Sequence, residues 1–155
     1  MAVGFDPLGT PVSGINSVYR EYTKDGNAGA QGDLASLESG VLSAASAGDF
    51  VCGVLTAAED ASATGVQVNI TPFLEGVMDN DNTGTTFAST HVGSRFDIIG
   101  GTGAQVIDTS SVDNTGGNPS GTLVCTQFNF SRPPYAGDAS IGLFAIVDHQ
   151  LWGGR

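Results

Sequence analysis

The chain has 155 residues, a net charge of −11 and a pI near 4.1, and only 14% of its residues are charged. This length suits one domain, or one domain with an arm. The five cationic residues are scattered and form no basic patch: Arg20, Lys24, Arg95, Arg132 and Arg155. Because such a chain repels phosphate backbones, we expect no nucleic-acid partner.

Residues 1–30 differ from the rest of the sequence. Prolines and glycines interrupt any periodicity, apart from a short β-like patch at residues 17–23. We therefore expect an extended N-terminal arm that has little core of its own and becomes ordered on another surface. The first residues show neither a basic region nor a signal-like apolar stretch, and no run approaches the length of a membrane span. We expect a protein made in a cytoplasm, without a membrane partner.

From residue 31 onward, short apolar runs alternate with Gly, Asn, Asp and Ser turns. Helix-favouring Glu, Lys and Arg are scarce, and no segment forms a strong amphipathic helix. The pattern predicts an all-β fold, a small β-barrel or sandwich of about eight short strands over residues 31–155. The expected strands are 33–37, 41–42, 50–55, 65–73, 91–99, 104–108, 121–130 and 141–148.

The last of these strands is apolar on both faces. Leu143 and Ala145 alternate with Phe144 and Ile146. A strand of this kind is buried on both sides, so we expect it at the centre of a sheet or in a subunit interface.

A Gly-Gly-Thr-Gly run at residues 100–103 has two interpretations. A phosphate-binding loop would need a following helix and commonly a lysine. Here the run is followed by Ala-Gln-Val-Ile-Asp, which alternates like a strand and contains no lysine. We therefore predict the turn of a β-hairpin.

No residue pattern indicates a catalytic or cofactor site. Asp79, Asp81, Thr83 and Gly84 resemble half of a calcium loop, but its twelfth position is Thr90 in place of Glu, so a solvated turn is favoured. His91 and His149 lack ligands at zinc spacing, which favours structural roles. Cys52 and Cys125 lie in apolar segments and are expected to be free buried thiols. We predict no cofactor, no metal and no enzymatic activity.

Aromatic residues gather near both ends of the chain. Phe5, Tyr19 and Tyr22 lie in or beside the arm, and Trp152 lies near the C-terminus. Aromatic side chains on arms and tails are frequent interface anchors, so we predict that these four residues contact a partner. An equal alternative is that Trp152 closes the bottom of the barrel. Pro133 and Pro134 predict a stiff connector before the last strand.

Two segments resemble the head decoration, or capsid cement, proteins of tailed bacteriophages. The first, residues 31–60, carries the turn-and-strand series Gly32-Asp33-Leu34, Gly40-Val41, Gly48-Asp49 and Gly53-Val54-Leu55. The second is THVGSRFDIIGGTGAQVIDTS. Together they cover about a third of the chain. The resemblance does not extend to residues 78–90 or 131–137.

The resemblance implies a β-rich homotrimer that binds the outer surface of a phage head and stabilises the lattice of the major capsid protein. The arm or an edge strand would reach onto that protein, and the location would be the virion. Two alternatives stay open. One is a carbohydrate-binding or adhesin-like module of a virion fibre or spike, using exposed aromatics and the loop at 78–90. The other is a nucleotide hydrolase on a trimeric β fold.

Overall fold

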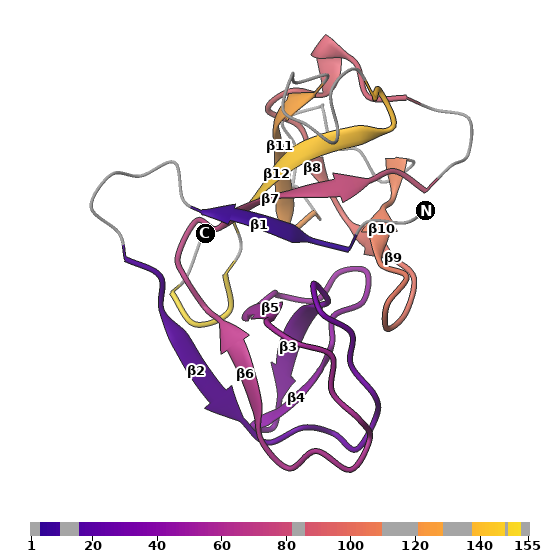
Figure 1. Cartoon of the computed structure of the whole chain (residues 1–155). Coiled ribbons are helices and arrows are strands. Elements are labelled where there is room, and N and C mark those ends of the chain that lie inside the picture. Colours follow the sequence, from indigo (N-terminus) through magenta and orange to yellow (C-terminus); the bar gives the residue numbers. More distant parts are fainter. Residues whose placement is uncertain are drawn as a thin grey trace.

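The computed structural model describes residues 4–9, 16–81, 86–109, 121–128, 138–147 and 149–152. It confirms the all-β prediction, with two five-stranded antiparallel sheets and one two-stranded sheet (Figure 1). The strands are β1 (Asp6–Gly9), β2 (Tyr19–Tyr22), β3 (Leu34–Glu38), β4 (Val41–Ala44), β5 (Gly53–Leu55), β6 (Val66–Asn69), β7 (Glu75–Asp79), β8 (Arg95–Phe96), β9 (Ile98–Ile99), β10 (Val106–Ile107), β11 (Leu123–Phe128) and β12 (Ile141–Ile146). One 3-10 helix, η1, covers Ser89–His91.

The first large sheet has the order β2-β6-β5-β3-β4 and is bent into a small barrel. The segment after β2 runs parallel to β4: the Leu42 N–H donates to Thr23 O at 2.8 Å, and the Asp25 N–H donates to Leu42 O at 3.0 Å. These bonds join the two edges of the sheet. The interior, which includes Leu42, Val66 and Val68, is aliphatic. We call this unit the β2–β6 barrel.

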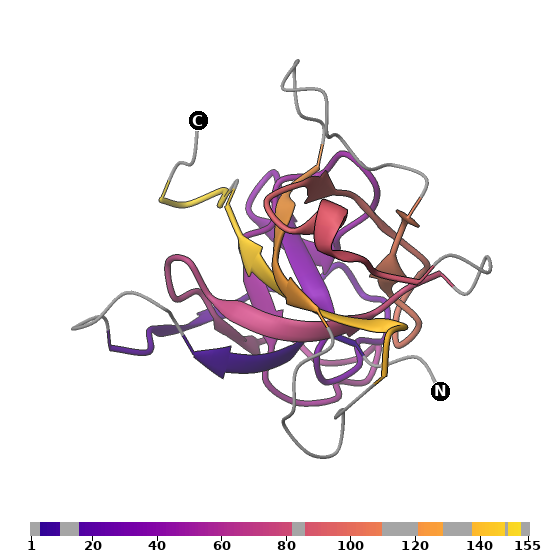
Figure 2. The same ribbon diagram turned by 90° about the horizontal axis from the view of Figure 1, so that it is seen from above.

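The second large sheet has the order β1-β7-β12-β11-β8, and we call it the β7–β12 sheet. The β9–β10 hairpin continues from β8, and Ile107 forms a bridge with Asn80 just beyond β7. Figure 2 shows this sheet lying across the barrel. One core cluster fills the space between them and contains residues from both, including Leu34 and Val54 from the barrel and Phe96 and Phe144 from the sheet.

The strand predictions were confirmed for most elements; several strands are shorter than expected, whereas β4 is longer than the predicted 41–42. β12 lies between β7 and β11, so the prediction of a central strand was correct. β1 and β7 were not predicted, and the expected strand at 91–99 is divided into the end of η1 and strands β8 and β9. The Pro133–Pro134 connector lies outside the described residues.

The first strand and the C-terminal segment each pair with the unit to which their neighbours in the sequence do not belong. β1 pairs with β7 of the sheet, although β2 belongs to the barrel. At the other end, His149 forms a parallel bridge with Val51 and the Gln150 N–H donates to Val51 O at 2.9 Å. The described part of residues 1–30 is therefore built into both sheets, which corrects the expectation of an arm with little core. Removing residues 1–20 would take away Phe5, a fully buried core residue.

Candidate functional site

The Gly-Gly-Thr-Gly run forms the turn of the β9–β10 hairpin, as predicted. Gly100 and Gly103 have φ angles of 94° and 71°, which suit glycine. The tip is docked on the barrel: the Gly103 N–H donates to Asp33 Oδ1 at 2.8 Å, and the Thr102 hydroxyl donates to Ala28 O at 3.2 Å. The backbone amide that a phosphate loop would offer to an anion is bound here to a carboxylate. The run has a structural role.

The acidic loop is only partly described, because Thr83 and Gly84 lie outside the described residues. Asp79 Oδ1 accepts a hydrogen bond from the Asn80 N–H at 3.0 Å, and Asp81 Oδ1 accepts one from the Thr109 hydroxyl at 2.8 Å. Within the described ranges, no three His, Cys, Asp or Glu side chains gather as metal ligands would. The Asp79 carboxylate binds the adjacent backbone, and the Asp81 carboxylate binds a residue just beyond β10.

Both histidines contact the protein itself. His91 Nδ1 accepts a hydrogen bond from the Ala88 N–H at 3.1 Å, and its ring stands edge-on to Phe87 and Phe96. His149 is buried, and its Nδ1 accepts a hydrogen bond from the Leu151 N–H at 3.1 Å. Burial lowers the pKa of His149 from 6.5 to about 4.

The two cysteines are free and buried, as predicted. Cys52 lies in the barrel interior, and Cys125 lies in the core shared with the sheet. Burial raises the pKa of Cys52 to about 12 and that of Cys125 to about 11. Neither thiol is activated as a nucleophile, because the reactive thiolate is disfavoured at neutral pH.

The four aromatic residues predicted at an interface occupy different environments. Phe5 is a core residue in this structure, and Tyr22 packs partly against the barrel interior. Tyr19 and Trp152 are exposed, at 45% and 50% respectively. The structure therefore brings only two of the four to the surface. These two come from different elements but both lie at the end of β6, because Tyr19 pairs with Asn69 and the Trp152 indole binds Ile70 O.

Trp152 combines features of both interpretations made from the sequence. Its indole N–H donates to Ile70 O at 2.6 Å, which ties the C-terminal segment to the end of the barrel. Half of the side chain is nevertheless exposed. The contact fixes the ring in place and leaves one side available to a partner.

Further apolar side chains are exposed on the segments to which the C-terminal residues bind. Phe50 precedes Val51, which pairs with His149, and Phe73 follows Ile70 by three residues. Figure 1 places the C-terminal segment beside the connection between β6 and β7. We call this set the tail surface: Phe50, Phe73, Leu151 and Trp152, with exposed fractions of 38%, 47%, 39% and 50%.

Phe73 is the most unusual member of the tail surface. Its φ angle is +55°, a left-handed conformation that is rare for a bulky side chain. The preceding residues are held by hydrogen bonds: Asn69 Oδ1 accepts from the Thr71 N–H at 3.1 Å, and the Val18 N–H donates to Thr71 Oγ1 at 2.9 Å. Strained residues that the fold retains are frequent at functional sites. Here the strained backbone presents an aromatic ring to solvent.

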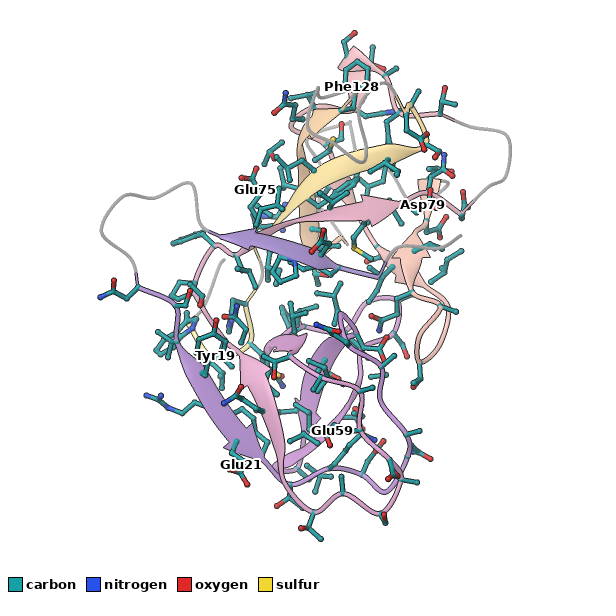
Figure 3. The ribbon with its side chains drawn as sticks, in the orientation of Figure 1. Tyr19, Glu21, Glu59, Glu75, Asp79 and Phe128 are labelled. Carbon is teal, nitrogen blue, oxygen red and sulfur yellow. The ribbon has the colours of Figure 1, made fainter. Side chains whose placement is uncertain are left out.

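A cleft of about 690 Å³ lies at the junction of the two units. Its walls come from residues before and in β1, from the loop preceding β3, and from β2, β5 and β6. Figure 3 shows Tyr19 at the end of β2 that faces β1. The lining is mixed, with aliphatic Val54 and Leu55 beside amide, hydroxyl and phenol groups.

Comparisons with protein-family models, with curated proteins and with solved structures found no match for this chain. In the described part of the chain, no helix has the length and apolar character that a membrane crossing requires.

Sequence reasoning missed Phe73 and the cleft. The sequence predicts a strand over residues 65–73, which places Phe73 at its end. In the structure, β6 stops at Asn69, so Phe73 lies in the connection that follows. The proline was the available clue, since it breaks the strand ladder before the exposed ring. The cleft combines residues from distant parts of the chain, such as Asp6, Gln31 and Gln67, and no local pattern could reveal it.

Proposed function

We propose that this protein is a capsid decoration protein, a non-enzymatic homotrimer that binds the outer surface of a phage head through its tail surface. The main support is Phe73, a half-exposed aromatic residue at positive φ that follows by three residues Ile70, whose carbonyl binds the half-exposed Trp152. Aromatic rings held in place before binding lose little conformational entropy on association and are frequent hot spots.

The charge of the molecule supports a location on the outside of a head. A trimer would carry three times −11, that is −33. Such a particle is repelled by packaged DNA and is well suited to solvent. The four members of the tail surface are uncharged, so they can be buried against a capsid protein without desolvating an ion.

The proposed mechanism is mechanical. A trimer that bridges neighbouring capsid subunits buries surface that outward expansion of the lattice would have to expose again. Binding to the mature lattice alone stabilises it by mass action. The three copies also raise the effective concentration of each contact.

The test is co-sedimentation with purified heads of the phage that carries this gene. We expect Phe73→Gly and Trp152→Ala each to weaken binding by about 2 kcal/mol, roughly 30-fold. Phe73→Gly should leave the free energy of unfolding within about 1 kcal/mol of wild type, because glycine relieves the positive φ.

The matched control is Val92→Ala, which truncates a 46% exposed apolar residue after η1 and should bind normally. Full binding by the Phe73→Gly/Trp152→Ala double variant would refute the role of the tail surface. Sedimentation equilibrium tests the trimer separately, and a monomer at all concentrations would contradict it.

A further inference from the structure

The junction cleft has the chemistry of a site for a neutral polar ligand. Among the residues described as lining it, Asp6 is the only charged one, and no Lys, Arg or His contributes. A phosphate or carboxylate would find no cation there, and the net charge of −11 would repel it. One carboxylate is also a poor site for a cation, which usually needs several oxygen ligands.

The polar side chains in the cleft are partly oriented before any ligand binds. The Thr56 hydroxyl lies 3.2 Å from both Gln67 Oε1 and the Gln67 carbonyl oxygen and shares its one proton between them, and the Gln67 NH₂ group can donate to a ligand. Asn69 Oδ1 accepts from the Thr71 hydroxyl at 2.5 Å, which orients the second amide in the same way. Groups fixed in advance reduce the entropy cost of binding.

Tyr19 adds an aromatic face to these amides. Its side chain is 45% exposed at the rim of the cleft, where the ring can pack against an apolar surface while the hydroxyl stays in water. A ligand with C–H faces and a rim of hydroxyl groups matches an aromatic ring beside amide donors and acceptors. Sugars have this combination.

An extended peptide fits the cleft less well. Addition of a strand requires a row of free N–H and C=O groups along an edge. On the β1 wall, Pro7 has no N–H, and the Phe5 N–H already donates to Gly32 O at 2.9 Å. The backbone here lacks the ladder that would fix a peptide in register.

We propose that the junction cleft binds a short neutral oligosaccharide, with Tyr19 stacking on one sugar ring and Gln67 and Gln31 binding its hydroxyl groups. The volume suits one or two sugar units. The cleft and the tail surface share no residue, although they adjoin at Asn69–Thr71, and binding of a sugar goes beyond the capsid-binding function. A decoration protein with such a site would carry a glycan-binding surface on the outside of a head.

The experiment is NMR titration of the full chain with maltose, cellobiose, lactose and N,N′-diacetylchitobiose. Sialyllactose serves as the anionic comparison. A peptide of alternating Thr and Val with both ends blocked, and therefore uncharged, serves as the strand-forming comparison. We expect saturation transfer to at least one neutral disaccharide and shifts of the Tyr19, Gln31 and Gln67 signals. Tyr19→Ala and Gln67→Ala should each weaken binding roughly tenfold. Val92→Ala is the control and should bind as wild type does.

Three outcomes would overturn the proposal: no shift with any neutral sugar at about 10 mM, a concentration at which weak specific binding is visible; unchanged affinity in both folded variants; or binding of the peptide alone. Because Tyr19 and Gln67 lie on different strands, misfolding of one variant leaves the other as a test. Head binding is measured in a separate assay, so failure here leaves the capsid proposal standing.

Discussion

The two units of this molecule solve the same packing problem with different side chains. The β2–β6 barrel is filled by Ala, Val, Leu, Ile and Cys. The core above it contains Phe5, Phe87, Phe96 and Phe144, and the last three meet edge-on with centroids 5.3 to 6.0 Å apart. A sheet joined to itself by backbone hydrogen bonds encloses little space, whereas the wider gap between sheet and barrel needs large rings.

Glycines lie where the packing of each unit is tightest. In the sheet, Gly76 leaves room for the Phe5 ring from the neighbouring chain segment, and Gly142 leaves room for the Phe144 ring of its own strand. In the barrel, a Cβ at Gly53 would stand 2.6 Å from Val68 Cγ1. The packing of the barrel is therefore limited by how closely its strands approach, and the packing under the sheet is limited by the volume of its aromatic rings.

The largest effect is expected from truncating a ring in the shared core. Phe144→Ala should lower the free energy of unfolding by about 3–5 kcal/mol, because it leaves a cavity beside the rings of Phe87 and Phe96. Val68→Ala in the barrel removes less volume and should cost about 2 kcal/mol. Chemical denaturation measures both. Equal losses for the two variants would show that ring volume does not distinguish the two units.

A smaller effect is expected at the glutamine that connects the units. Gln105 is fully buried: its Oε1 accepts from the Leu34 N–H at 2.6 Å, and its Nε2 donates to Leu34 O and Ala45 O at 3.0 and 2.9 Å. Gln105→Met should cost about 2–4 kcal/mol, because buried backbone groups lose their partners.

Gln150 supplies the matched control at the other end of β3. Its amide accepts from the Leu37 N–H at 2.7 Å and donates to Leu37 O at 2.6 Å, but in an exposed position. Water can replace these bonds, so Gln150→Met should cost less than about 1 kcal/mol. A larger loss for Gln150→Met than for Gln105→Met in denaturation would contradict this account.

A further effect, confined to acid pH, is expected at His149. The folded-state pKa of His149 is about 4, below its usual 6.5, so the unfolded chain takes up a proton first as the pH falls. This contribution to stability is present above pH 6.5 and is lost between pH 6.5 and 4, by about 2 kcal/mol. His149→Gln should remove that part of the pH dependence. Denaturation at pH 7 and pH 4.5 compares the two proteins, and parallel losses would contradict the prediction.

The sequence predicted the all-β class and most strands because turn residues and apolar runs are local signals. It failed at β7, where Glu75 and Asp79 mark the ends of the strand (Figure 3) and mask its central position. It failed at β1 because Pro7 argues against a strand, although an edge position tolerates proline. The exposure of Trp152 was partly anticipated. The burial of Phe5 depends on pairing with residues about 70 positions away, which no local pattern records.

The pairing of each chain end with the other unit has a consequence for the order of synthesis. A ribosome releases residues 16–71 while Gln105 and Gln150 are still to be made, so β3 emerges without the side chains that bind its two ends. β1 likewise waits for β7. The β2–β6 barrel can close through its own backbone bonds, but the contacts that Gln105 and Gln150 make with β3 form only after the strands of the second sheet have been made.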